Sequence, residues 1–208
     1  MTGRSTENPD LKGLVSFYRQ NAERHGNDIG AVAWGSRQSQ EKRFQILAEI
    51  ADLNGRSVLD VGCGLGDFYG WLKQEQVNVR YSGIDITQSM IDLAQQSHPG
   101  EDFQVVNILD AAPSPTTYDY VFASGVFNRR VPGHQSFVND SVVRMFDLCR
   151  YGMAFNILSI KADLKEPDEY HADPGEMLDF CLSLSRKATL RHDYMTHDFT
   201  VYVFKESL

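Results

Sequence analysis

The segment VLDVGCGLGDF, residues 58–68, constrains this chain more than any other part of its sequence. A short apolar run that fits a buried strand stops at Gly62, Gly64 and Gly66, and a helix is expected to begin near Asp67. Glycine tolerates positive φ and lets a ligand approach the backbone, and the free N–H groups at a helix start face that ligand. A glycine-rich turn without a ligand is the alternative, but the flanking strand and helix favour a binding loop.

Strand-like and helix-like segments alternate from about residue 57 onward. We expect strands at 57–61, 79–85, 103–108, 118–124 and 151–158, and helices at 67–76, 87–97, 135–148 and 174–185. Apolar strands separated by helices are typical of a parallel sheet that is buried on both faces. The last two strand-like segments, 188–194 and 199–205, are separated by four residues, so they are expected to pair antiparallel.

The residues before the sheet form an N-terminal segment, 1–55, that we expect to be helical. One helix is predicted over LKGLVSFYRQNAERHG and a second over 39–53, with Asn54 and Gly55 as its stop. No linker separates this segment from the sheet, and 208 residues fit one domain, so 1–208 is predicted to be a single domain with a helical cap.

The charge balance excludes some classes of protein. Lys and Arg number 20 and Asp and Glu number 28, which gives a formal charge of −8 and disfavours a nucleic-acid partner. The chain contains no apolar run long enough to span a membrane and no signal-peptide pattern, so a cytoplasmic location is expected. The three cysteines have no paired spacing, so neither a disulfide framework nor a metal site is expected.

Asp85 is the second chemical anchor of the sequence. It lies at the end of the second expected strand, in YSGIDITQSM, where a carboxylate can accept both ribose hydroxyls of a nucleoside. The alternative is an Asp that caps the helix beginning near Thr87, and both roles can coexist.

With these features the sequence resembles the class I S-adenosylmethionine-dependent methyltransferases. DVGCGLG resembles their first motif, Asp85 matches the acid of their second strand, and YDYVFASGVFN resembles their fourth-strand motif. The terminal hairpin agrees, and WGSRQSQEKRF resembles small bacterial members of the family. The resemblance implies a Rossmann-like, doubly wound α/β fold. Its seven-stranded, mostly parallel sheet would have the order 3-2-1-4-5-7-6, an antiparallel last strand and helices on both faces.

The resemblance also implies a site for S-adenosylmethionine, which leaves as S-adenosylhomocysteine. The expected cofactor-binding residues are Trp34, Arg37, Arg43, Asp60, Gly62, Cys63, Gly64, Gly66, Asp85, Ile86, Met90, Asn107, Ile108 and Ser124. Within this set, Asp60 and the glycine loop would face the methionine part, and an arginine would meet its carboxylate. Asn107 stands where many members have an acid for the adenine amine. Ordinary core packing is the alternative for Trp34, Ile86, Met90 and Ile108, and a solvated surface for the arginines.

The acceptor is expected over the carboxyl ends of the strands. The loop 125–133, the N-terminal helix and the long connection 159–174, a candidate lid, should converge there. His171, His134 and Tyr170 are the candidate catalytic residues, with a histidine as general base. Tyr18, Asn128, Arg129 and Arg130 are the candidate substrate-binding residues, because adjacent arginines can attract an anionic acceptor. Packed or solvated side chains are the alternative for the histidines and arginines.

The leading hypothesis is therefore a methyltransferase acting on O or N of a small, anionic metabolite, as a monomer or homodimer. Three alternatives stay open. The first is methylation of a protein or RNA, and the second is a non-catalytic module that binds S-adenosylmethionine. The third is a nicotinamide oxidoreductase, which the glycine spacing and the terminal hairpin disfavour.

Overall fold

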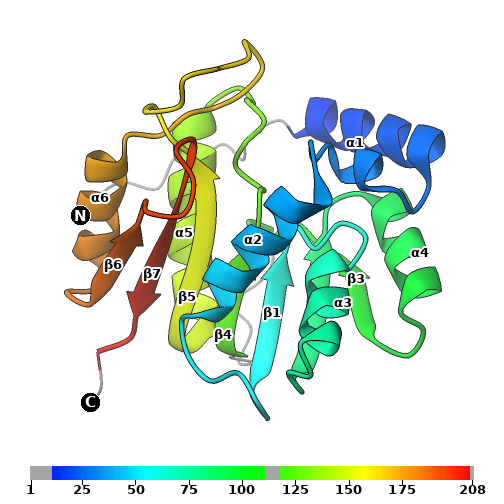
Figure 1. The fold of residues 1–208 in the computed structure, drawn as a ribbon, viewed down its shortest axis with the longest axis horizontal. Helices are drawn as coiled ribbons and strands as arrows, with labels where there is room; N and C mark the ends of the chain where they lie inside the picture. The colour runs from blue at the N-terminus through cyan, green and yellow to red at the C-terminus, as the bar shows by residue number, and fades with distance from the viewer. Residues whose placement is uncertain (1–10, 111–117, 207–208) are drawn as a thin grey trace.

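The apolar strand-like segments assemble into one sheet in the computed structural model, which describes residues 11–110 and 118–206 (Figure 1). The strands are β1 (Ser57–Val61), β2 (Arg80–Asp85), β3 (Asp102–Val105), β4 (Tyr118–Ala123), β5 (Cys149–Leu158), β6 (Ala188–Arg191) and β7 (Asp198–Phe204). Their order across the sheet is β3-β2-β1-β4-β5-β7-β6. β7 pairs antiparallel with β5 and with β6, while the other strand pairs are parallel. The predicted strand order and the antiparallel last strand are both confirmed.

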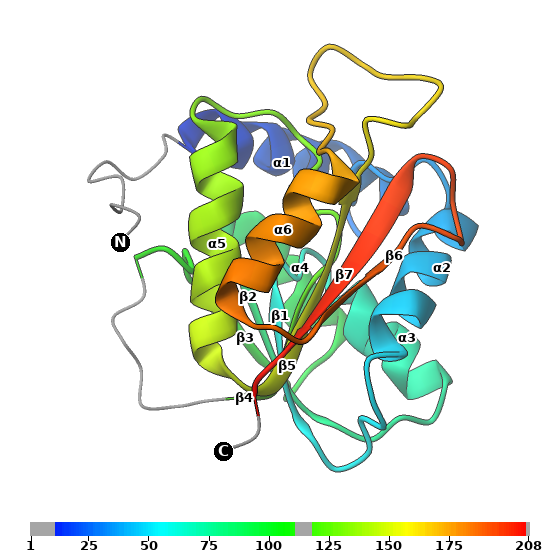
Figure 2. The same cartoon turned by 90° about the vertical axis from the view of Figure 1, so that its left-hand side faces the viewer.

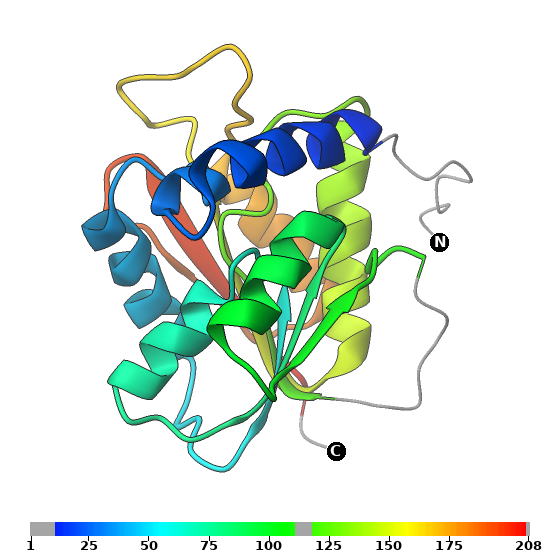
Figure 3. The ribbon, with the colours of Figure 1, turned by 90° about the vertical axis from the view of Figure 1, so that its right-hand side faces the viewer.

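Helices cover both faces of this sheet. They are α1 (Lys12–His25), the 3-10 helix η1 (Ile29–Val32), α2 (Arg37–Ala48), α3 (Asp67–Gln74), α4 (Gln88–Ser97), α5 (His134–Leu148) and α6 (Pro174–Leu184). α2, α3 and α4 lie on one face and α5 and α6 on the other (Figure 2). α1 crosses above the carboxyl ends of the strands (Figure 3).

Alternating side chains of each central strand explain why both faces need a cover. In β1, Val58 packs on the α2–α4 side with Phe68 and Phe122. The next residue, Leu59, packs on the α5–α6 side with Met153. Successive side chains of a strand point to opposite faces of the sheet. A strand with apolar side chains on both faces must therefore be covered on both.

The N-terminal segment differs in detail from the prediction. The second helix begins at Arg37, where the Ser36 hydroxyl accepts a hydrogen bond from the Ser39 N–H, and it ends at Ala48 rather than at residue 53. Ile50 and Leu53 are buried although they lie beyond the end of the helix. Their apolar side chains therefore do not require the longer helix that the sequence predicts. η1 was not predicted, and residues 1–10 of the expected segment lie outside the described residues.

None of the helices in residues 11–110 and 118–206 has the length and apolar character needed to cross a membrane.

Candidate functional site

A cavity of about 960 Å³, counted to its open mouth, lies at the carboxyl ends of β1, β2 and β4 under α1. The glycine loop forms part of its floor. Gly62 and Gly64 have φ of 68° and 53°, which side chains rarely adopt. A Cβ on Gly62 would lie 2.5 Å from the Val126 side chain, so this loop is closed by a contact that only glycine permits.

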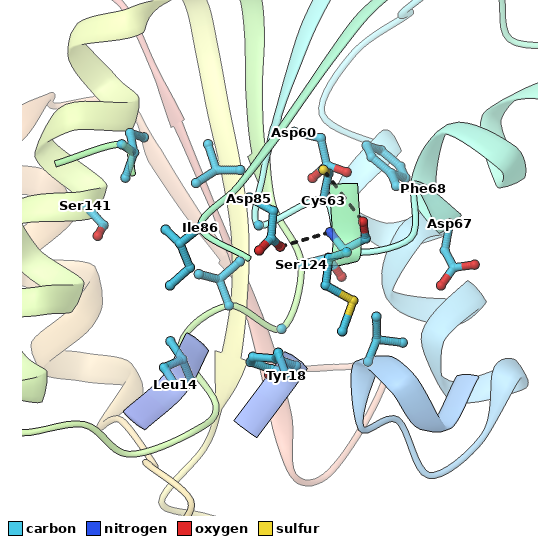
Figure 4. Close-up of a pocket in the computed structure, with 18 of the residues that line it drawn as sticks. Leu14, Tyr18, Asp60, Cys63, Asp67, Phe68, Asp85, Ile86, Ser124 and Ser141 are labelled. Carbon is cyan, nitrogen blue, oxygen red and sulfur yellow. Dashed lines mark hydrogen bonds between the residues drawn. The ribbon is translucent and has the colours of Figure 1, made fainter. Parts of the chain in front are cut away.

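Asp85 stands in the middle of the cavity (Figure 4). One carboxylate oxygen accepts from the Gly64 N–H at 3.1 Å, and the other accepts from the Thr87 N–H at 2.8 Å. Burial raises the pKa of Asp85, and these N–H groups oppose that rise. A carboxylate has about four acceptor positions, so two remain for a ligand. Asp85 can therefore accept a hydrogen bond from the N–H group before α4 and still bind a ligand.

Asp60 is more deeply buried than Asp85. Its Oδ2 accepts a hydrogen bond from the Tyr81 hydroxyl at 2.6 Å. Burial raises the pKa of Asp60 to about 7, although the bond from Tyr81 acts in the opposite direction. A cation in the cavity would favour the charged form of this carboxyl group.

Most of the predicted cofactor residues line this cavity. They are Trp34, Asp60, Gly62, Cys63, Gly64, Asp85, Ile86, Met90, Asn107, Ile108 and Ser124, and the predicted substrate residue Tyr18 joins them. The Asn107 amide already supports the turn after β3, since its Oδ1 accepts from the Leu109 N–H at 3.0 Å and its Nδ2 donates to Asp110 at 3.0 Å. One lone pair on Oδ1 is left for a ligand amine.

Three predicted cofactor residues do not line the cavity. Gly66 begins α3 and packs under Phe103. Arg37 is mostly exposed, 3.9 Å from the carboxylate of Asp67, which does line the cavity. Arg43 is buried and binds Asp198 at 2.9 Å, with its guanidinium 4.6 Å from the centre of the Trp34 ring. Arg43 therefore supports the wall of the cavity rather than its contents.

The predicted substrate residues Asn128, Arg129 and Arg130 hold the 159–173 connection. The Asn128 carbonyl accepts from the Tyr170 N–H at 2.8 Å. Arg129 binds Asp168 at 2.6 Å and lies over the Phe17 ring of α1, 3.6 Å from its centre. Arg130 donates to the Glu169 carbonyl. The 159–173 connection arches above the strand ends in Figure 2. These residues thus join the 125–133 loop to that connection and, through Arg129, to α1.

The three predicted catalytic side chains lie outside the cavity lining. The Val131 N–H donates to Nδ1 of His134 at 3.1 Å, and its Nε2 faces the Phe127 carbonyl at 3.0 Å. His134 thus has no free lone pair to act as a base, and burial lowers its pKa to about 4. Tyr170 stacks on His134 and bonds to Gln135, while His171 lies 3.4 Å from Glu169. All three side chains pack the 159–173 connection onto α5 or against itself.

Several lining residues were not predicted. They are Leu11, Leu14, Val32, Gln40, Phe44, Val61, Asp67, Phe68, Val106, Gly125, Val126, Phe137 and Ser141. Most are apolar residues, which fit ordinary core packing in the sequence. Gln40 and Ser141 are different, because each is buried and has a side-chain oxygen with no hydrogen-bond partner among the described residues. Only the assembled fold shows that these two residues line a cavity.

Comparisons with known proteins show which proteins this chain is similar to. A family model described as a methyltransferase domain matches residues 59–145. A protein of Mycobacterium tuberculosis named as a methyltransferase, Rv1506c, is 30% identical over 158 residues, which cover 73% of this chain and 94% of that protein.

Two longer relatives match over part of their length. A trans-aconitate 2-methyltransferase of Rhodopseudomonas palustris is 37% identical over 89 residues, 43% of this chain and 34% of the relative. A malonyl-[acyl-carrier protein] O-methyltransferase of Halalkalibacterium halodurans is 27% identical over 126 residues, 52% of this chain and 45% of the relative. The matches thus span less than half of these two enzymes.

Among solved structures, the magnesium protoporphyrin IX methyltransferase of Synechocystis PCC 6803 with bound S-adenosylmethionine has a similar fold. The TM-score is 0.68 at 13% identity, and the match covers 97% of this chain and 100% of that one.

Proposed function

Because the chain belongs to the class I S-adenosylmethionine-dependent methyltransferases, we propose that it methylates an oxygen or nitrogen atom of a small molecule that carries a carboxylate. Membership makes the chain an enzyme and S-adenosylmethionine its cofactor. When bound, the cofactor supplies a methyl group on a positively charged sulfur, from which the acceptor atom displaces it.

The lining of the cavity fits that cofactor in its chemistry. The glycine loop lines the cavity with backbone rather than side chains, and Gly62 packs so closely on Val126 that no side chain fits there. Asp85 offers its remaining lone pairs to a pair of ribose hydroxyls, as an acid does in other nucleotide-binding sheets. Ile86 and Ile108 give the same end of the cavity apolar walls suited to an adenine ring. These residues would hold the nucleoside, and the glycine loop would face the amino-acid part.

The cap would exclude water from the transfer. Tyr18 of α1 and Trp34 line the mouth, and Trp34 fits so closely that a Cβ on Gly125 would lie 2.6 Å from its ring. A site closed by apolar and aromatic side chains keeps water from competing with the acceptor. We assign this role to the N-terminal segment, with the 159–173 connection beside it.

The ionisable groups of the cavity lining bear on which acceptor the enzyme can use. None of the described residues that form it is a histidine or a lysine. Burial raises the pKa of Tyr18 to about 12, so its hydroxyl stays protonated at neutral pH. The acids of the lining are Asp60, Asp67 and Asp85. Asp85 accepts from two backbone N–H groups, whereas Asp60 accepts from Tyr81 through one oxygen and has a pKa of about 7, so the lining does contain a group that can take up a proton near neutral pH. A hydroxyl acceptor has to lose a proton, whereas a carboxylate is ionised at neutral pH.

The proposal that the acceptor is anionic rests on the position and charge of Arg129. Its guanidinium lies over the Phe17 ring, whose centre is 5.1 Å from that of Tyr18, and Tyr18 lines the cavity. Asp168, the partner of Arg129, is 57% exposed, and exposed ion pairs are worth about 0–1 kcal/mol. An acceptor carboxylate can replace Asp168 at that cost. Two relatives bear names with the same chemistry, since trans-aconitate and the malonyl group both carry carboxylates.

The test uses S-adenosylmethionine labelled in its methyl group and a panel of di- and tricarboxylic acids, each beside its amide. We expect label in the acids and not in the amides. Label in a carboxyl ester is released as methanol by base, which separates it from N-methylation. Arg129→Gln should raise KM for the acid several-fold and leave S-adenosylhomocysteine affinity unchanged, while the remote Arg150→Gln should change neither.

Base-stable label in protein or RNA of a cell extract would contradict the small-molecule proposal. Equal turnover of the acids and their amides would contradict the proposal that the acceptor carries a carboxylate.

A further inference from the structure

Gln40 presents a buried oxygen to one end of the cavity. The residue lies on α2 and is 2% exposed. Its Nε2 donates to Oδ2 of Asp67 at 2.9 Å, which fixes the orientation of the amide. Gln40 lines the cavity, and its Oε1 is buried with no hydrogen-bond partner among the residues that the structure describes. A buried amide oxygen without a hydrogen bond is destabilising, so a ligand that donates to it would relieve that cost.

The chemistry of this end of the cavity selects a cation. Gln40 Oε1 is an acceptor, and the adjacent Asp67 carboxylate accepts and carries a negative charge. Asp67 is only 18% exposed, so this charge is poorly screened by water. An ammonium group, with three N–H donors, satisfies both. A carboxylate would meet two acceptors and a like charge.

A positive group stands beside the acceptor pair. Nη1 of Arg37 lies 3.9 Å from the other oxygen of Asp67, and Arg37 is mostly exposed. Arg37 can therefore turn toward a carboxylate without breaking a buried contact. A negative and a positive side chain next to each other match the two charges of an α-amino acid.

The position of this pair within the cavity agrees with that chemistry. Figure 4 shows Asp67 at one end, Ser141 at the other and Asp85 between them. If Asp85 binds the ribose and Ile86 faces the adenine, the remaining part of the cofactor extends toward Asp67. The inference rests on the proposed function for that placement.

We propose that Gln40 and Asp67 bind the α-ammonium group of the methionine part of S-adenosylmethionine. Through this contact the enzyme distinguishes its cofactor from nucleosides that lack the amino group. Neither residue touches the transferred methyl group, so both are binding residues.

The test compares two ligands by calorimetry. One is S-adenosylhomocysteine, and the other is the same molecule with hydrogen in place of the α-amino group. Gln40→Met keeps the length of the side chain and removes both amide groups. It should weaken S-adenosylhomocysteine binding about tenfold, the scale of a hydrogen bond to a charged group, and change binding of the des-amino ligand less than about twofold. Gln38→Met is the matched control, because Gln38 is exposed on the same helix, and neither affinity should change.

Asp67→Asn supplies a second variant should Gln40→Met fail to fold, which its melting temperature will show. It should show the same selective loss for the amino-bearing ligand. Equal losses for both ligands would mean that the pair only supports the cavity, and unchanged binding would remove the pair from the site. Either result overturns this inference. Failure of the unmodified enzyme to bind S-adenosylhomocysteine at all would instead overturn the proposed function.

Discussion

Asp60 shows how one residue can be held in an unfavourable state by the fold. Its carboxyl group is buried at the end of β1, with the Tyr81 hydroxyl as its hydrogen-bond donor. Burial raises its pKa from 3.8 to about 7. The folded protein therefore binds a proton more tightly than the unfolded chain between these two values. Stability from this group is greatest at acid pH and falls as pH rises toward 7.

Asp60→Asn should remove that dependence. At pH 8 the ionised carboxylate is costly, whereas at pH 5.5 the group is largely protonated in the folded state. The substitution should thus stabilise the ligand-free protein by about 2 kcal/mol more at pH 8 than at pH 5.5. Urea denaturation at the two pH values measures this difference. The control is Asp163→Asn on the exposed 159–173 connection, which should show no pH-dependent difference. Equal effects of Asp60→Asn at both pH values would refute a raised pKa.

At the same scale, some residue roles could be predicted and others could not. Gly62, Gly64 and Asp85 have a chemical signature in the chain itself, since a turn needs glycines and a ribose needs an acid at a strand end. The position of His134 in the sequence says nothing about which atoms its ring nitrogens meet. Both nitrogens are occupied by backbone groups, which only tertiary structure reveals.

The elements of the sheet followed from apolar runs and short connections, but the contacts between distant elements did not. α2 and β7 are joined by Arg43 and Asp198, both nearly fully buried. Tyr194 and His197 of the preceding turn complete the network, with Tyr194 bonding to Asp198 and His197 lying 3.3 Å from Arg43. In the sequence Arg43 was a candidate for a ligand carboxylate. The carboxylate that it meets belongs to a strand 155 positions later.

Breaking this pair should destabilise the protein much more than breaking an exposed one. Arg43→Met leaves Asp198 buried and unpaired, which should lower the free energy of unfolding by about 3–5 kcal/mol. Adding Asp198→Asn should recover part of the loss. Arg186→Met removes the exposed pair with Glu206 and should lower the free energy of unfolding far less than Arg43→Met does. Urea denaturation measures all three, and a loss as small for Arg43→Met as for Arg186→Met would deny the pair its structural role.

Over the whole molecule, the site is assembled from the sheet and from the N-terminal end of the described chain. The sheet supplies the floor, and α1 closes the cavity with Leu14 and Tyr18. α1 itself buries only Leu14 and Ala22. A helix with so few buried side chains opens locally at low free-energy cost. A ligand beneath it would add contacts to α1 and raise the free-energy cost of this opening.

Hydrogen exchange should detect this coupling. Saturating S-adenosylhomocysteine should slow amide exchange in α1 by more than about tenfold, because opening α1 would expose or release the ligand. α6 is the matched control, since it also buries only two side chains, Met177 and Cys181, and it does not line the cavity. Its exchange by local opening should be unchanged. Equal slowing of both helices would indicate a global effect of binding, and no slowing in α1 would mean that the helix does not close over the ligand.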